Sequence, residues 1–103
     1  MTRRKLPQRR ASKTFDLLFK TNKPWHVTIG FFEDDTPGEV FVNGAKTIGT
    51  DLDAMARDGA ILISLALQYG VPLVTIARAL TRNADNSPSA ITGAIVDRML
   101  SEE

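Results

Sequence analysis

Two runs in the first half of the chain alternate hydrophobic and polar residues with a period of two, and a run before them, FDLLFK, is rich in aromatic and aliphatic residues. Such alternation is typical of β-strands that bury one face. The runs span residues 15–20, 26–33 and 39–42, and turn-forming Asn, Asp, Pro or Gly residues follow each of them. Because only short turns separate the runs, the pattern predicts a three-stranded antiparallel β-meander.

In the second half of the chain the apolar residues recur at the period of a helix. Thr50 is a candidate N-cap with Asp53 three residues later, and the pattern continues to about residue 69, where Gly70 predicts a helix end. We expect a second helix over residues 72–80. A third, capped by Ser87, carries apolar residues at helical spacing: Ile91, Ile95 and Met99. The predicted fold class is therefore α+β, with the meander followed by three helices.

The first of these helices is apolar on nearly every side. Its centre, GAILISLAL from residue 59 to residue 67, contains Ser64 as its single polar residue. A helix that is hydrophobic all round must be buried all round, and three short strands with two short helices offer little surface to cover it. We therefore expect a long central buried helix shared within a homo-oligomer, dimer or larger, the alternative being a monomer wrapped by the short helices. The predicted interface residues are Gly59, Ala60, Ile63, Ala66 and Leu67.

Length and composition restrict the function. A chain of 103 residues has room for one domain, which we expect over residues 14–103, behind a basic N-terminal arm at residues 1–13. No apolar run reaches the roughly 18 residues that cross a bilayer, and the basic start lacks the apolar stretch of a secretion signal, so we expect a cytoplasmic protein without a membrane partner. With no cysteine and one histidine, His26, the chain is expected to hold no catalytic residue, metal or cofactor.

Charge is unevenly distributed along the chain. Residues 1–23 contain eight Lys or Arg against one acid, and residues 24–103 contain five against eleven, giving +7 and −6. This asymmetry predicts an arm that binds an anion, either nucleic acid, a nucleotide phosphate or the acidic body of a neighbouring subunit; a solubilising tail is the alternative. Glu39 is a candidate partner for an arginine of the arm. The candidate ligand-binding residues of the arm are Arg3, Arg4, Lys5, Arg9 and Arg10.

A second candidate anion site precedes the long helix. Lys46, Thr47, Gly49 and Thr50 lie just before its first turn, where free N–H groups and the helix dipole favour negative charge. The segment lacks the pattern of a glycine-rich phosphate loop. A plain capped helix start is the competing interpretation.

Three further side chains are candidates for ligand contact. Trp25 and His26 have flat rings that can stack on a nucleobase, or can simply pack at the start of a strand. Gln68 lies four residues after Ser64 on the long helix, so the two form a polar stripe. That stripe either meets a ligand at a subunit boundary or satisfies a backbone carbonyl.

The string SLALQYGVPL, residues 64–73, resembles the TSCPD domain, which occurs at the C-terminal end of cobalamin-dependent (class II) ribonucleotide reductases and as a free-standing small protein. The lead-in KLPQRR, the stretch TIGFFEDDTPGEVFV and the pair Gly49 and Asp53 extend the resemblance. The stretch RALTRNADNSPSAITGAI resembles stand-alone members. Asp35 stands where the family turn usually has glycine, and the reductase's catalytic barrel and cysteines are missing. The resemblance thus implies a fold and a place in nucleotide metabolism, without a catalytic residue.

Three functions follow as hypotheses. The first is a non-enzymatic oligomeric binding module that binds or sequesters a nucleotide, a cyclic nucleotide or another phosphate ligand, for example in a viral or defence-related protein. The alternative is a detached accessory domain that docks onto a separate ribonucleotide reductase subunit. The third is nucleic-acid binding through the basic arm, which would weaken steeply with salt.

Overall fold

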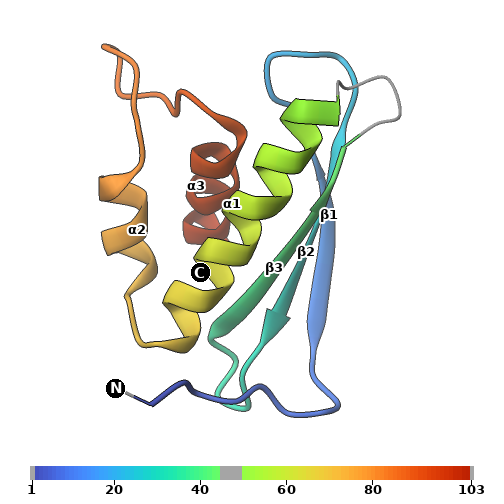
Figure 1. The fold of residues 1–103 in the computed structure, drawn as a ribbon, viewed down its shortest axis with the longest axis vertical. Helices are drawn as coiled ribbons and strands as arrows, with labels where there is room; N and C mark the ends of the chain where they lie inside the picture. The colour runs from blue at the N-terminus through green and yellow to red at the C-terminus, as the bar shows by residue number, and fades with distance from the viewer. Residues whose placement is uncertain (1, 45–49, 103) are drawn as a thin grey trace.

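The computed structural model describes residues 2–44 and 50–102. Three antiparallel strands form a sheet in the order β1-β2-β3, and three helices cover one face of it (Figure 1). The long helix α1 runs alongside β3, and the shorter α2 and α3 lie beyond it. The predicted α+β fold is confirmed. The elements are β1 (Ser12–Leu17), β2 (Trp25–Phe31), β3 (Pro37–Asn43), α1 (Thr50–Gln68), α2 (Leu73–Ala79) and α3 (Ile91–Ser101).

The first strand lies three residues earlier than predicted. It pairs with β2 from Ser12 opposite Gly30 to Leu17 opposite Trp25, so β2 fixes where β1 begins and ends. The apolar residues that suggested a strand continuing to residue 20 fall in the connection instead, where Lys20 adopts a φ of 59°. Pairing across the sheet therefore overrides the local apolar pattern at this strand end.

The helix boundaries agree closely with the prediction, but two caps differ. Gly70 follows α1 with a φ of 92°, as a C-terminal glycine should. Pro72 is the N-cap of α2 rather than its first residue, and Ala90 replaces the predicted Ser87 as the N-cap of α3. Ser87 instead donates its backbone N–H to Asp85 at 2.9 Å and closes the preceding turn. In the described part of the chain, no helix combines the length and apolarity needed to cross a membrane.

The core lies between the sheet and the helices. Trp25, Val27 and Ile29 of β2 expose at most 2% of their surface. Burying an aliphatic or aromatic side chain stabilises a fold by roughly 1.5–3 kcal/mol, so this layer is the main source of stability. The helices complete it with Ala56, Ala60, Ile63, Leu67, Leu73, Ile76, Ala77, Ile91, Ile95, Val96 and Met99.

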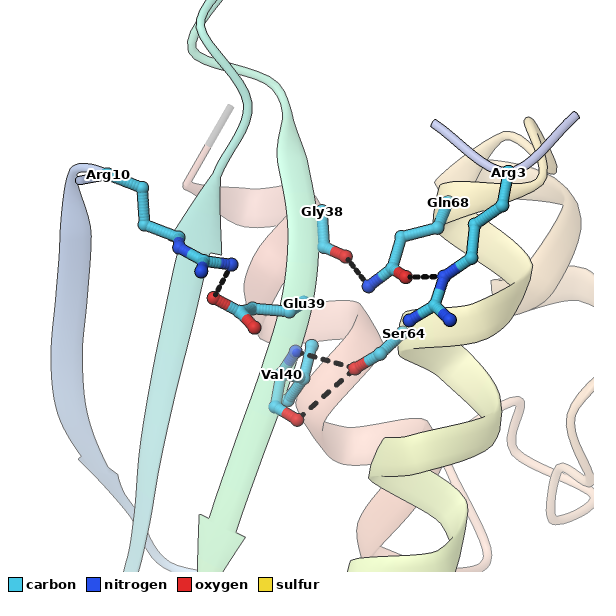
Figure 2. Close-up of polar contacts among 7 residues, drawn as sticks. All are labelled: Arg3, Arg10, Gly38, Glu39, Val40, Ser64 and Gln68. Carbon is cyan, nitrogen blue, oxygen red and sulfur yellow. Dashed lines mark hydrogen bonds and ion pairs between the residues drawn. The ribbon is translucent and has the colours of Figure 1, made fainter. Parts of the chain in front are cut away.

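Polar residues of α1 cover the outer edge of β3 (Figure 2). The Val40 N–H donates to Ser64 Oγ at 2.8 Å, and Ser64 Oγ lies 3.3 Å from Val40 O. One turn further along α1, Gln68 Nε2 donates to Gly38 O at 2.8 Å. The backbone groups that an edge strand normally presents to another chain are thus occupied from within at these positions.

Candidate functional site

The N-terminal arm folds back on its own chain. The backbone N–H of Arg4 donates to Gln68 O at 2.7 Å. Figure 2 shows the neighbouring contact, in which Arg3 Nε donates to Gln68 Oε1 at 2.6 Å. The Arg4 guanidinium lies 3.9 Å from the centroid of the Phe32 ring and pairs with Asp34 at 3.1 Å. Gln68 therefore satisfies backbone and arm groups of its own chain, which is the second of the two interpretations drawn from the sequence.

The charges of the arm divide into paired and unpaired groups. Arg10 pairs with Glu39 at 3.0 Å, so the partnership expected from the sequence is confirmed. Lys5 and Arg9 are exposed and make no ion pair with any described residue. Part of the positive charge is thus balanced by the acidic body of the same chain, and part remains for another anion.

The acidic turn after β2 is a local structure. Asp34 Oδ1 accepts hydrogen bonds from the backbone and the hydroxyl of Thr36, and these bonds, with a smaller contribution from Arg4, lower the pKa of Asp34. Asp35 adopts a φ of 66°, a conformation that Asp tolerates better than most residues. The turn therefore forms although Asp35 stands at the position where the similar family usually has glycine. Among the described residues, no group of three or more potential metal ligands is found.

A hollow of about 720 Å³ lies where the arm crosses the open face of the sheet, opposite the helices. We call this hollow the arm cleft and define it by Arg9, Arg10, Thr28, Glu39 and Phe41, which line it. Phe41 is 57% exposed. Guanidinium groups beside an exposed aromatic face form a surface suited to a phosphate and a flat base.

Phe41 is a lining residue that the charge pattern of the sequence does not indicate. Its signal in the sequence is its position between Val40 and Val42, because a strand that alternates its faces must turn Phe41 away from the core. A further hollow of about 400 Å³ lies on the other side of Arg10 and is lined by Arg3, Arg4 and Lys5. All five arm residues predicted to bind a ligand therefore border one of two adjoining hollows.

Trp25 and His26 point to opposite faces of the sheet. Trp25 is 2% exposed in the core, so it packs at the strand start, and its Nε1 has no hydrogen-bond partner among the described residues. His26 is exposed, and its Nδ1 lies 2.6 Å from Asp16 Oδ1 on β1. Neither ring lines the arm cleft. Four candidate groups, Lys46, Thr47, Gly49 and the side chain of Thr50, lie outside the described residues, and their role stays a prediction.

The residues predicted to form a subunit interface separate into two groups. Ala60, Ile63 and Leu67 are 2%, 5% and 9% exposed in the core of the chain itself, so no partner is needed to bury them. Gly59 and Ala66 are half-buried and line a groove of about 190 Å³ between α1, α2 and α3. Ile63 borders the same groove, so three of the five residues line a surface that a partner can reach.

Part of the apolar surface of α1 remains uncovered. Met55, Ile61 and Leu62 are 69%, 55% and 66% exposed, and Val74 of α2 is 43% exposed. We call these four residues the exposed apolar group of α1 and α2. Apolar groups on a helix that remain exposed in the single chain are typical of a surface that contacts another protein.

The chain shows clear similarity to known proteins. A family model described as the TSCPD domain matches residues 2–100. The chain belongs to the TSCPD domain family. A vitamin B12-dependent ribonucleotide reductase of Agrobacterium fabrum is 42% identical over 79 residues, which cover 77% of this chain and 6% of the relative. The corresponding protein of Rhodopirellula baltica is 35% identical over 77 residues, 72% of this chain and 7% of the relative.

This TSCPD domain thus spans a small fraction of the length of the curated relatives it matches. No solved structure matches the chain. The string that carried the resemblance forms the junction of α1 and α2, where Gly70 N–H donates to Leu67 O at 3.1 Å and Val71 N–H donates to Ala66 O at 2.9 Å. These two bonds form a Schellman motif that ends α1. The glycine of the TSCPD string is therefore explained by helix termination.

Proposed function

We propose that this TSCPD domain is a non-catalytic module that binds a phosphate-bearing nucleotide in the arm cleft. The observation that carries the proposal is that Arg9 and Phe41 line the same hollow. Arg9 has no acidic partner among the described residues, and Phe41 exposes 57% of its surface. A guanidinium suits the phosphate, and an aromatic ring suits the face of the base.

The neighbouring groups support binding rather than chemistry. Arg10 is held by Glu39, which positions its guanidinium at the edge of the cleft and partly balances its charge. Thr28 lines the same hollow, and its Oγ1 lies 3.1 Å from Thr14 Oγ1 on β1, where one of the two hydroxyls donates to the other. No cysteine is present in the chain, so a thiol cannot act as nucleophile or reductant here.

The relatives support a nucleotide as the ligand class. Both are vitamin B12-dependent ribonucleotide reductases by name. A small domain shared with such proteins has a reason to recognise the nucleotides on which they act. The cleft chemistry and the family relationship therefore favour the same ligand class.

Calorimetry with dATP tests this function. We expect the native chain to bind with a dissociation constant below about 0.1 mM, and Arg9→Glu to weaken binding at least about tenfold, or about 1.4 kcal/mol. Phe41→Ala should weaken it as well, through lost stacking. Arg78→Glu, the same change on exposed α2, is the matched control and should bind normally. Absence of binding by the native chain, or equal losses in Arg9→Glu and Arg78→Glu, would reject the arm cleft as the site.

The exposed apolar group of α1 and α2 favours a second function, contact with another protein through α1. We propose a further copy of this chain as the first partner and a separate reductase subunit as the alternative. The exposed side chains of Ile61 and Leu62 support this, because association would remove them from water. Copurification with a vitamin B12-dependent reductase subunit, lost in Leu62→Glu, would select the alternative.

The basic arm also supports a third function, binding of single-stranded nucleic acid. A strand would place several phosphates along the arm, so its affinity should fall steeply as salt rises. A single nucleotide places fewer phosphates in contact with the arm, so its affinity should depend less steeply on the salt concentration. Comparing dATP with a ten-nucleotide single strand at two salt concentrations distinguishes these ligands.

A further inference from the structure

Glu39 lies at the centre of the basic surface that the arm forms. Its carboxylate pairs with Arg10 at 3.0 Å, and these two residues line both the arm cleft and the adjoining hollow. Among the described residues, Glu39 is the only acidic side chain that lines either hollow. A single carboxylate therefore holds the guanidinium that the two hollows share.

The middle strand of the sheet leaves room for this carboxylate. Gly30 of β2 is paired with Glu39 of β3, and a Cβ at Gly30 would lie 2.9 Å from Glu39 Cδ and closer still to Oε2. Figure 2 shows the side chains of Glu39 and Arg10 pointing toward one another. Because Arg10 precedes β1, the Glu39 side chain reaches it by lying across β2 at the glycine. Any side chain at position 30 would compete with the carboxylate for the same space.

The carboxylate of Glu39 and the phosphate of a ligand would bind Arg10 in the same way. Both anions accept charge-assisted hydrogen bonds from a guanidinium. The side chains of Arg10 and Glu39 are 30% and 16% exposed, so the pair is partly shielded from water. Lys5 and Arg9 make no ion pair with any described residue and attract an anion without such competition. A phosphate that reaches Arg10, in contrast, must take the place of Glu39.

We propose that Glu39 is an internal competitor for the anion site, which holds Arg10 in the free chain and is displaced when a ligand phosphate binds. This inference rests on the proposed function of the arm cleft and adds the regulation of that site. A phosphate with two negative charges can displace a carboxylate from a partly exposed pair. A nucleoside without phosphate gains nothing from Arg10. Glu39 thus lowers the affinity for every phosphate ligand and restricts Arg10 to strongly charged ones.

Removal of the competitor tests the proposal. We expect Glu39→Gln to bind dATP at least about tenfold more tightly than the native chain in calorimetry, or by about 1.4 kcal/mol. Asp16→Asn is the matched control, because it removes one negative charge from the same face of the sheet, where Asp16 contacts His26 instead. Its affinity should change less than about twofold, since an exposed charge is screened by salt.

The outcomes separate this proposal from the function on which it rests. Equal dATP affinity of the native chain and Glu39→Gln, or an equal gain in Asp16→Asn, would overturn the role of Glu39 and leave the arm cleft in place. Absence of binding in the native chain and in Glu39→Gln would reject the arm cleft itself.

Gly30→Ala distinguishes displacement from simple repulsion. The added methyl group occupies the space of the carboxylate and moves it off Arg10, while the negative charge remains in the chain. We expect tighter dATP binding than in the native chain, whereas repulsion alone predicts no gain. A melting curve shows whether this variant folds. Glu39→Asp, which keeps the charge on a side chain too short for the same contact, makes the same test without changing β2. An affinity at or below the native value in both variants would overturn the proposal.

Discussion

Ser64 of α1 contacts both backbone polar groups of Val40 on the outer strand β3. Its Oγ accepts from the Val40 N–H at 2.8 Å and lies 3.3 Å from Val40 O, and it also donates to Ala60 O at 2.8 Å. The one polar residue in the apolar centre of α1 therefore covers part of a sheet edge. Because β3 is occupied at this position, β1 is the strand whose outer edge remains available for pairing.

We predict that Ser64→Ala lowers the free energy of unfolding by about 1–3 kcal/mol, since it leaves the buried N–H of Val40 without its acceptor. Urea denaturation measures the change, and hydrogen exchange of the Val40 amide should become faster. Ser101→Ala, which removes a hydroxyl bonded to Arg98 O at the exposed end of α3, is the control. Equal stability of the two variants would show that the Ser64 contact contributes nothing.

Gln68→Met should loosen the N-terminal arm. The change keeps the size of this buried side chain but removes its bonds to Arg3 and to Gly38 O. Trypsin should then cleave after Arg3 and Arg4 several times faster than in the native chain. The reason is that an arm released from the folded body can extend into the active site of the protease. Gln8→Met, an exposed change within the arm itself, should leave the rate unaltered. Equal cleavage of the native chain and Gln68→Met would refute the role of Gln68 as the anchor.

The ion pair of Arg82 and Asp97 should make stability depend on pH. Arg82 donates to the two carboxylate oxygens at 2.9 and 2.6 Å, and this hydrogen bonding lowers the pKa of Asp97 in the folded chain. The pKa of an aspartate in the unfolded chain is about 3.9. Because the pKa of Asp97 is lower in the folded chain, its ionised carboxylate stabilises the fold at pH values above the unfolded pKa. This contribution is lost as the pH falls through the pKa of the folded chain.

Asp97→Asn should therefore be less stable than the native chain at pH 7, with a difference that shrinks below about pH 4. Urea denaturation at several pH values measures this difference. Asp58→Asn, on an exposed part of α1 with no ion pair among the described residues, is the matched control. A deficit of Asp97→Asn that stays constant down to pH 2 would exclude the ion pair as its cause.

We predict that light scattering will show a dimer or larger species for the native chain. Leu62→Glu should convert it to a folded monomer, because Leu62 is 66% exposed and is not needed in the core. Ala66→Glu should also dissociate it, at some cost in stability, because Ala66 is half-buried in the groove. Thr75→Glu, an exposed change on α2, is the control. A native monomer at micromolar concentration would contradict the prediction.

Some features of the candidate sites follow from the sequence, and others do not. The basic arm and a pairing of Glu39 with one of its arginines were predicted from charge alone, because opposite charges attract whatever their exact placement, and the structure identifies that arginine as Arg10. Phe41 could be assigned to the arm cleft only from the folded sheet, which shows the face on which its side chain lies.

The sequence by itself determined the order and type of the elements. Residue periods, turn formers and Gly70 are local signals, and local backbone preferences are strong enough to decide a strand, a helix or its end. The tertiary structure decided the register of β1, the side of α1 that is buried and the docking of the arm. Those features depend on contacts between residues far apart in the chain, such as Arg3 with Gln68, 65 residues away, and Ser64 with Val40, 24 residues away. Only the folded chain brings such pairs together, so no local pattern can specify them.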